Sequence, residues 1–319
     1  MLSARLRALA LSAFAVIVSA CGAGTASAPA GYGPPATTGA PPAAVQRRLP
    51  RDVVYVSDYV NEEVLAFPAS TRAKNPAPLL TIALGTHPNG LWVDRDGILY
   101  VAAYSSLLEF KPGLTTPFRT ITDGVTGAEG VTVDKRGTLY VVNHAGADVT
   151  VVEYRHGGGA PSQTLTMTEP DSLFGFPGGA TFDAAGNLYV STLFYPETNG
   201  HVFRFAPGAT TGTDLGLADV GSQDGLAFDA QGNLYVGDLG PVAVYRPGAT
   251  QPFETIGKSS DYPSFFAVSA KGFVYAPYAA GVPSKSRLLE YTSEGKQVDA
   301  IGGTYVSGPT GVALRSSAF

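Results

Sequence analysis

The sequence predicts an all-β fold built from a repeated unit, and two observations support this prediction. The chain has 319 residues, of which 39 are glycine and 24 proline, while only 15% are charged. This composition is typical of many short strands joined by turns, and the length is sufficient to bury a large core. A phrase also recurs, as "PNGLWVDRDGILYVA" at 88–102, "AEGVTVDKRGTLYVV" at 128–142 and "QDGLAFDAQGNLYVG" at 223–237.

The recurrent glycine sets the period of the repeat. It falls at Gly90, Gly130, Gly179, Gly225 and Gly311, with Phe265 in the equivalent place of the fifth copy. The intervals are 40, 49, 46, 40 and 46 residues. Periods in this range indicate an array of supersecondary units.

Each copy has the same internal order. A short first strand ends at an aspartate, and a turn with glycine in its last place follows, as in "DRDG", "DKRG", "DAAG" and "DAQG". Asp94, Asp134, Asp183 and Asp229 are interpreted as turn formers, because aspartate accepts backbone hydrogen bonds within such turns. A second strand ("ILYVAAY", "TLYVVNH"), a third ("LLEFKPG", "VAVYRPG") and a more variable fourth complete the unit. Four antiparallel strands in 40–49 residues are the signature of a β-propeller blade.

The tyrosine of the second strand gives the number of blades. It occurs six times, at Tyr55, Tyr100, Tyr140, Tyr189, Tyr235 and Tyr275. The first copy lacks a preceding first strand, and "GVALR" at 311–315 lacks a following second strand. We therefore predict a six-bladed β-propeller of four-stranded antiparallel blades, closed when the C-terminal strand joins the blade that begins at Asp52.

These repeats resemble NHL-repeat propellers, whose blades read like "P-x-G-V-A-V-D-x-x-G-N-L-Y-V", and the wider gluconolactonase and regucalcin type of six-bladed propeller. The resemblance covers residues 51–319. It is specific for the fold and weak for activity, because such scaffolds carry many functions.

The N-terminal segment is predicted to lie outside the propeller. Residues 1–20 combine Arg5 and Arg7 with an apolar run and end in "VSAC", where Cys21 is the only cysteine of the chain. This pattern resembles a bacterial lipoprotein signal, in which the cysteine is lipidated and becomes the new N-terminus; an ordinary secretory signal is the alternative. Residues 21–50 are rich in Ala, Gly, Pro and Thr and are expected to form a flexible tether. The resulting expectation is a lipid-anchored, extracytoplasmic protein of the bacterial cell envelope.

Strand order predicts which residues share one face of the ring. The loop into the first strand and the loop between the second and third strands lie at the same end, which we call the upper face. The residue before each recurrent glycine is then expected to line the mouth of the central channel: Asn89, Glu129, Gly178, Asp224, Ser264 and Thr310. The second-to-third loops add Asp58, Asn143, His144 and Asp238.

The upper loops also contain aromatic residues that do not follow the repeat. They are Tyr59, Tyr104, Phe194, Tyr195 and Tyr278, and they are expected to form an exposed rim for a ligand or protein. The insertion at 191–200 is the best candidate for a partner-specific loop.

The resemblance to the gluconolactonase family implies a cation site. That family binds a cation through a glutamate, an asparagine and an aspartate at inner strand starts, and here Glu129, Asn89 and Asp224 stand in matching contexts. Ca²⁺ or another hard divalent cation prefers such oxygen donors. The chain order differs from that of the family, because Asn89 precedes Glu129 and Asp224 follows three repeats after Asn89. The alternative, which we favour, is a polar and water-filled channel lining.

Catalytic motifs are sparse. His144 is a weak candidate for a general base, and an exposed loop histidine is the alternative. Neither a G-x-S-x-G nucleophile motif nor an H-E-x-x-H zinc motif occurs. The formal charge of −5 argues against nucleic acid as a partner.

Three function classes follow. The first is a monomeric, tethered module that binds a protein, peptide, glycan or small molecule on the upper face. The second is a divalent-metal-dependent lactonase or esterase that uses the channel mouth. The third is a structural component of the envelope.

Overall fold

The computed structural model describes residues 46–69, 75–169, 171–218, 220–221, 225–237, 240–258, 264–279, 285–302 and 304–315. The expected signal peptide, Cys21 and the tether up to residue 45 lie outside the described residues, as do Asp224 and Asp238. The described part of the chain is all-β. No helix in it is long and apolar enough to cross a membrane.

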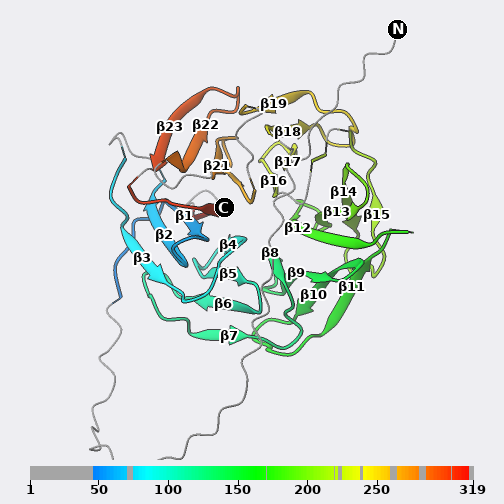
Figure 1. Cartoon of the computed structure of the whole chain (residues 1–319), viewed down its shortest axis with the longest axis horizontal. Helices are drawn as coiled ribbons and strands as arrows, with labels where there is room; N and C mark the ends of the chain where they lie inside the picture. The colour runs from blue at the N-terminus through cyan, green and yellow to red at the C-terminus, as the bar shows by residue number, and fades with distance from the viewer. Residues whose placement is uncertain are drawn as a thin grey trace, which may run out of the picture. The chain divides into compact units, whose positions relative to one another are not determined.

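The described strands form six antiparallel sheets of four strands, arranged around a central axis (Figure 1). Blade 1 contains β24 (Pro309–Arg315), β1 (Val53–Asp58), β2 (Glu63–Pro68) and β3 (Leu80–Ala83); blade 2 contains β4 (Leu91–Val93), β5 (Leu99–Ala103), β6 (Ser106–Phe110) and β7 (Arg119–Ile121); blade 3 contains β8 (Ala128–Val133), β9 (Leu139–Ala145), β10 (Asp148–Tyr154) and β11 (Gln163–Met167). Blade 4 contains β12 (Phe174–Phe182), β13 (Leu188–Tyr195), β14 (Gly200–Phe205) and β15 (Thr213–Asp214); blade 5 contains β16 (Leu226–Phe228), β17 (Leu234–Gly237), β18 (Val242–Tyr245) and β19 (Glu254–Ile256); blade 6 contains β20 (Ala267–Val268), β21 (Val274–Tyr278), β22 (Arg287–Tyr291) and β23 (Gln297–Gly302). The predicted fold class is confirmed.

The ring is closed by its two ends. Strand β24 pairs antiparallel with β1, from Val53 opposite Arg315 to Ser57 opposite Gly311. The prediction that 311–315 forms the innermost strand of the first blade is therefore confirmed. All strands of the ring come from residues 53–315, so a chain that begins at Ala43 contains every strand and its closing pair.

The hydrophobic core lies between neighbouring blades. Strand residues alternate between the two faces of a sheet, and in a propeller each face packs on the next blade. Val53 and Tyr55 of blade 1 pack with Leu91 and Val101 of blade 2 in one cluster of buried side chains. Each blade is therefore buried on two sides, which explains why its central strands are almost continuously apolar.

The lower face consists of turns whose aspartates are bonded within their own repeat. Asp94 Oδ1 accepts hydrogen bonds from the backbone nitrogens of Asp96 and Ile98, both at 2.9 Å. Its Oδ2 accepts a hydrogen bond from the Tyr100 hydroxyl at 2.9 Å. Burial raises the pKa of Tyr100 above its ordinary range, and the charge of Asp94 adds to this shift. The interpretation of these aspartates as turn formers is confirmed, and the structure adds that three of them, Asp94, Asp183 and Asp229, accept a hydrogen bond from the repeated tyrosine.

Contact with the propeller begins before residue 51. Gln46 Nε2 donates to the Pro112 carbonyl at 3.0 Å, and the Arg47 backbone nitrogen donates to the Gly113 carbonyl at 3.0 Å. Gln46 and Arg47, which belong to the expected tether, therefore lie against the turn between β6 and β7.

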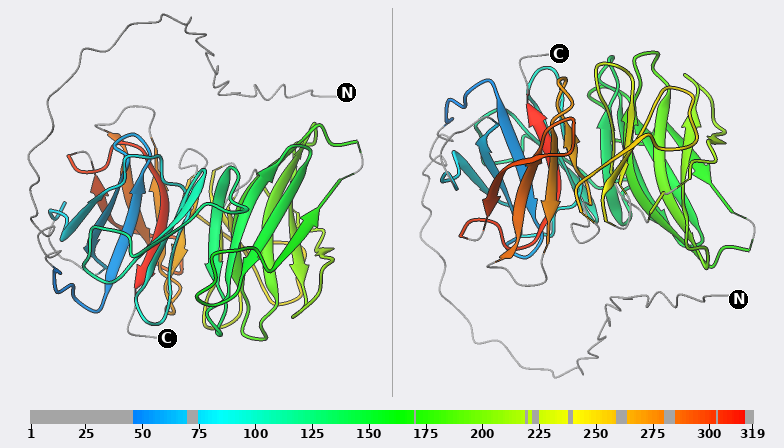
Figure 2. Two further views of the ribbon diagram at one scale, coloured as in Figure 1. Left: turned by 90° about the horizontal axis from the view of Figure 1, so that it is seen from below. Right: turned by 90° about the horizontal axis from the view of Figure 1, so that it is seen from above.

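Blade 4 departs from the others in height. Its inner strand β12 has nine residues, whereas β16 of blade 5 has three. The long strands are visible in the green part of the ring when it is viewed from the side (Figure 2). The extra residues lie at the upper end of β12, before Gly179, because the repeated glycine fixes the register of the inner strands.

Candidate functional site

The inner strands of neighbouring blades are hydrogen bonded to each other at two of the repeated glycines, Gly90 and Gly225. The Gly90 nitrogen donates to the Glu129 carbonyl at 2.8 Å, and the Gly225 nitrogen donates to the Ser264 carbonyl at 2.7 Å. A Cβ atom on Gly90 would lie 2.5 Å from the Glu129 carbonyl oxygen, so a larger residue would displace a strand. The residue before each glycine consequently lies at the upper end of its strand, beside the next blade. Below these contacts, the inner strands surround a cavity of about 170 Å³ that includes Trp92 and Phe182.

Asn89 and Glu129 lie side by side at this rim. The buried Asn89 side chain donates from Nδ2 to the Ala128 carbonyl at 3.3 Å, next to Glu129 in the chain. The half-buried Glu129 carboxylate has no hydrogen bond or ion pair within the described residues. Burial raises the pKa of Glu129 to about 7. The rim thus presents an unpaired carboxylate next to an amide oxygen.

The expected cation trio is only partly described. Asn89 and Glu129 are adjacent and offer oxygen donors of the right chemistry, while Asp224 and also Asp238 lie outside the described residues. Among the residues with described positions, no group of three His, Cys, Asp or Glu side chains is arranged to hold a metal ion. Ca²⁺ binding by Asn89, Glu129 and Asp224 therefore stays a prediction.

Asp58 belongs to the closure of the ring. Its fully buried carboxylate accepts hydrogen bonds from the backbone nitrogens of Val60, Asn61, Ser307 and Gly308, and from Asn61 Nδ2. These partners join the β1–β2 turn to the segment that precedes β24. The side chain has little capacity left for a ligand.

Asn143 is used in a similar way. The buried side chain donates to the Gly124 carbonyl at 2.8 Å and accepts from the Thr126 nitrogen at 3.4 Å. It therefore holds the loop that leads into β8.

His144 lies at the upper end of β9. Its Nδ1 accepts a hydrogen bond from the Gly146 nitrogen at 3.3 Å, and its ring meets Phe176 edge to face with centroids 6.3 Å apart. No carboxylate pairs with its ring among the described residues. The structure thus connects His144 to the aromatic residues of blade 4 and shows no base or acid partner beside it.

The upper loops carry exposed aromatic side chains. Tyr104 is 63% exposed and Tyr195 is 41% exposed. Tyr278 is half-buried and packs on the core between blades 5 and 6. Tyr59 stacks on His87 with ring centroids 4.2 Å apart.

One member of the expected aromatic rim is wrong. Phe194 is fully buried and packs against Phe203 and the core between blades 3 and 4. It alternates with Tyr195 along β13, and the two side chains point to opposite faces of the sheet.

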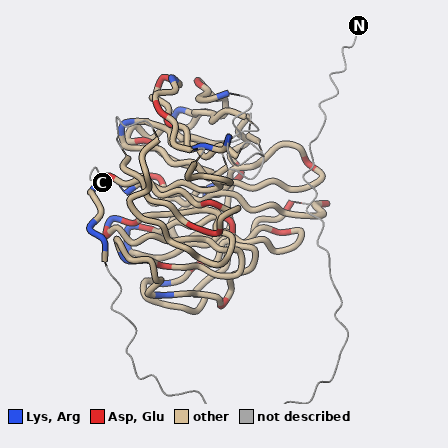
Figure 3. The backbone as a smooth tube through the Cα atoms, turned by 60° about the vertical axis from the view of Figure 1, so that its left-hand side comes forward, with Lys and Arg blue, Asp and Glu red and all other residues tan. Residues whose placement is uncertain are grey.

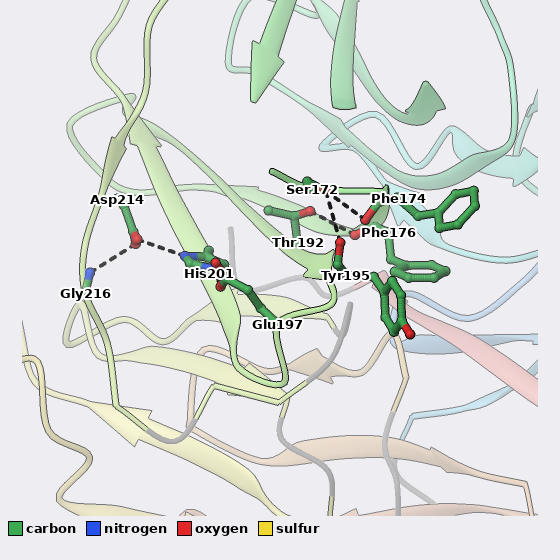
Figure 4. Close-up of polar contacts among 9 residues, drawn as sticks. All are labelled: Ser172, Phe174, Phe176, Thr192, Tyr195, Glu197, His201, Asp214 and Gly216. Atoms are coloured by element: carbon green, nitrogen blue, oxygen red, sulfur yellow. Dashed lines mark hydrogen bonds and ion pairs between the residues drawn. The ribbon is translucent and has the colours of Figure 1, made fainter. Parts of the chain in front are cut away.

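Sequence reasoning missed two other residues of this surface. Leu173 and Phe174 are 60% and 52% exposed, and Phe174 lies opposite Tyr195 in the β12–β13 register. Only an apolar stretch before the Gly178–Gly179 pair could have indicated that β12 continues above the rim. Figure 4 shows the rings of Phe174, Phe176 and Tyr195 on one side of this hairpin.

His201 links the other side of blade 4. Its Nε2 lies 2.7 Å from Glu197 Oε2 and its Nδ1 lies 2.9 Å from Asp214 Oδ2 (Figure 4). The hydrogen bond to Asp214, against the opposing effect of burial, raises the pKa of His201 to about 9. The same bond lowers the pKa of Asp214. At neutral pH this is a paired imidazolium that joins the loop after β13 to β15.

A further cavity lies on the lower side between blades 4 and 5. Its volume is about 480 Å³, and its lining includes Tyr189, Arg204, Phe228 and Arg246. It is separate from the mouth residues and shares its acidic turn residues with the lower face.

Comparison with known proteins supports the fold. No protein-family profile and no curated protein sequence matches the chain. A structure of a protein of unknown function from Bacteroides caccae has a TM-score of 0.62 at 13% identity, over 83% of this chain and 99% of that one. Hydrazine synthase from Kuenenia stuttgartiensis has a TM-score of 0.56 at 13% identity, over 86% and 93%. A gluconolactonase from Xanthomonas campestris has a TM-score of 0.53 at 15% identity, over 70% and 78%. At these identities the similarity shows the propeller fold alone, and a fold does not by itself specify an activity.

Proposed function

We propose that this protein is an extracytoplasmic β-propeller, tethered to a bacterial membrane through a lipid on Cys21, that binds a ligand on its upper face. The ligand would be a protein, peptide, glycan or small molecule, and the protein would act as a monomer. The tether and the location rest on the N-terminal sequence alone.

The two faces of the ring differ in how their polar and aromatic side chains are used. The upper face exposes Tyr104, Phe174 and Tyr195 and holds the unpaired carboxylate of Glu129, whereas the aspartates of the lower turns are bonded within their own repeats. Exposed aromatic side chains beside a desolvated polar group are typical of binding surfaces. The upper face is therefore the part of the ring with unused binding capacity.

The test is a binding screen with matched variants. The chain from Ala43 onward would be screened on arrays of glycans and peptides, and any ligand titrated against Tyr104→Ser and Glu129→Gln. We expect at least one of these variants to weaken binding about tenfold. Arg136→Ser on the lower face serves as the control. A ligand whose affinity changes only in the control variant would contradict the upper-face assignment. Loss of the membrane-bound fraction in Cys21→Ser cells tests the tether separately.

A second candidate is a divalent-metal-dependent hydrolase of a lactone or ester. The adjacency of Asn89 and Glu129 favours it, because both offer oxygen atoms at the channel mouth. A cation held there would polarise a carbonyl group and activate water. The packing of blade 2 against blade 3 positions these two residues beside each other, one position before the glycines that line the central cavity.

Melting temperatures separate the two candidates. Ca²⁺, Mg²⁺, Mn²⁺ or Zn²⁺ at about 100 times Kd should raise Tm by about 5 °C if the folded form holds the ion. The rise should disappear in Glu129→Gln and persist in Asp96→Asn, an exposed position of a lower turn. Absence of any rise removes the hydrolase in its metal-dependent form and leaves the binding module.

A further inference from the structure

The upper end of the β12–β13 hairpin presents an exposed apolar surface. We define the blade-4 patch as Leu173, Phe174 and Tyr195, which are 60%, 52% and 41% exposed, together with the half-buried Phe176. Phe174 and Phe176 alternate with Gly175 and therefore point to the same side of the sheet. In Figure 4 both rings lie beside that of Tyr195. Strand β12 is six residues longer than β16 of the next blade, and Phe176 near its upper end meets the His144 ring of β9 edge to face.

The patch is held in place by the fold. The Leu173 nitrogen donates to the Tyr195 carbonyl at 2.8 Å, and Thr192 Oγ1 donates to the Phe176 carbonyl at 2.9 Å. A surface fixed before binding loses little further conformational entropy when a partner docks. The exposed aromatics are therefore preorganised for contact.

The surroundings of the patch are acidic. Between Arg155 and Arg204 the sequence contains no lysine or arginine. Glu169 and Asp171 lie in this stretch and Asp148 precedes it, and these three carboxylates form no ion pair within the described residues. Figure 3 shows lysine and arginine gathered toward one side of the tube, while loops on the opposite side carry Asp and Glu.

These carboxylates lie on the same structural unit as the patch. Ser172 Oγ donates to the Ala147 carbonyl at 3.3 Å, and the Gly175 nitrogen donates to the Gly146 carbonyl at 3.0 Å. The loop that carries Glu169 and Asp171 is thus bonded to the β9–β10 turn that precedes Asp148. Negative charge and exposed aromatic surface are therefore presented together.

We propose that the blade-4 patch is the docking site for a lysine- or arginine-bearing segment of a partner protein. This deepens the proposed binding function and rests on it. Basic side chains would pair with Asp148, Glu169 and Asp171 and lie over the rings of Phe174 and Tyr195, while apolar side chains between them contact Leu173 and Phe176. Charge complementarity selects a cationic partner, and the same acidic loops repel anionic lipid surfaces.

The shape of the surface indicates a polypeptide. The patch is the exposed end of a hairpin, and the cavities described above are lined by other residues. Small molecules are generally bound in concave sites, whereas protein segments bind exposed aromatic surfaces with a charged rim.

Fluorescence anisotropy with designed peptides tests the proposal. The probe is a labelled peptide of about ten residues with alternating lysine and leucine, compared with a glutamate–leucine peptide and a lysine–glycine peptide of the same length. With the chain from Ala43, we expect the lysine–leucine peptide to bind about tenfold more tightly than either comparison peptide. The preference over the glutamate peptide should fall as salt is added.

Variants locate the binding surface. The double variant Phe174→Ser/Tyr195→Ser should weaken binding of the lysine–leucine peptide about tenfold. The double variant Asp148→Asn/Asp171→Asn should weaken binding by roughly severalfold and should reduce its salt dependence. Phe253→Ser is the matched control, because Phe253 is 45% exposed on blade 5 beside Arg246. Asp171→Lys is a second variant that leaves the apolar residues intact, should the aromatic double variant fail to fold.

Two results would overturn the proposal. One is equal binding of the lysine–leucine and glutamate–leucine peptides. The other is an affinity for the lysine–leucine peptide that is unchanged in both Phe174→Ser/Tyr195→Ser and Asp171→Lys. If array ligands still depend on Tyr104 or Glu129 in that case, only the docking proposal fails; if they do not, the upper-face function fails with it.

Discussion

The lower turns and the upper loops of this ring use the same residue types differently. At the lower face, Asp183 accepts hydrogen bonds from Asn187 and from the Tyr189 hydroxyl within a single repeat. At the upper face, the Glu129 carboxylate has no partner within the described residues, and Tyr195 is exposed. Acidic and aromatic residues thus stabilise the blade at one end and are available at the other.

This difference follows from the repeat. A residue that recurs in each copy occupies the same environment in each blade, so its contacts are internal and its side chain is satisfied. A residue that occurs once has no such requirement, and its side chain can face solvent or a ligand. Departure from the repeat is therefore informative only when the structure also leaves the side chain without an internal partner.

Asp58 is an exception to this difference between the two faces, because it lies at the upper face and yet its carboxylate is fully hydrogen bonded within the fold. Asp58→Ala would leave the buried nitrogens of Ser307 and Gly308 without their acceptor. We expect a loss of about 4 kcal/mol in the free energy of unfolding, measured by urea denaturation. Asp58→Asn should lose less, because an amide oxygen remains. A loss below about 1 kcal/mol in the alanine variant would show that these bonds do not hold the closure.

Asp183 tests the lower face. Asp183→Ala removes the acceptor for Asn187 and Tyr189 and should lower the free energy of unfolding by about 2 kcal/mol at neutral pH. Burial opposes ionisation of this carboxyl, but the hydrogen bonds from Asn187, Tyr189 and the backbone outweigh it and lower its pKa.

The pH dependence of this effect has a definite sign. A depressed pKa stabilises the fold above the unfolded value, 3.8, and that stabilisation is lost as the pH falls through the folded pKa. The difference between the wild type and Asp183→Ala should therefore shrink on acidification. Unfolding curves at pH 7 and at pH 3 measure it, and a difference that grows in acid would contradict the assignment.

His201 gives a smaller effect with the opposite pH dependence. Its pKa is raised to about 9 from 6.5, so its contribution is complete below pH 6.5 and is lost as the pH rises through about 9. Asp214 has a lowered pKa and keeps its side of the pair until acid is reached. His201→Gln should cost about 1 kcal/mol at pH 6 and close to none at pH 10, by thermal or urea unfolding. A cost that is equal at the two pH values would indicate packing against Phe194 instead of the ion pairs.

The sequence predicted the fold through its periodic residues. Gly90, Asp94 and Tyr100 recur at fixed offsets, and the turn bonds of the aspartate are found again at Asp134, Asp183 and Asp229. The number and order of the blades could therefore be derived from the sequence. The closing strand was predictable because "GVALR" is the first half of a repeat whose second half is missing.

The site was less accessible to sequence reasoning because it depends on contacts between distant segments. Asp58 is bonded to Ser307 and Gly308, which lie about 250 residues further along the chain. Leu173 and Phe174 are exposed at the upper end of a strand that is six residues longer than β16, a difference that the repeated residues do not specify. Phe194 could have been placed correctly, because it has the same strand parity as the buried Val190.

Substitution of Tyr104 is expected to have the smallest effect on stability, and it tests the upper face most directly. Its side chain is 63% exposed. Its backbone has a positive φ of 49°, and the conformational energy of such a backbone is about the same for serine as for tyrosine. Tyr104→Ser should therefore change the free energy of unfolding by less than about 0.5 kcal/mol. The matched change in a repeated position, Tyr235→Ser, removes a buried ring and its bond to Asp229 and should cost about 3–5 kcal/mol. Urea unfolding of the two variants compares a free tyrosine with a structural one, and equal losses would mean that Tyr104 belongs to the framework of the ring and not to its binding face.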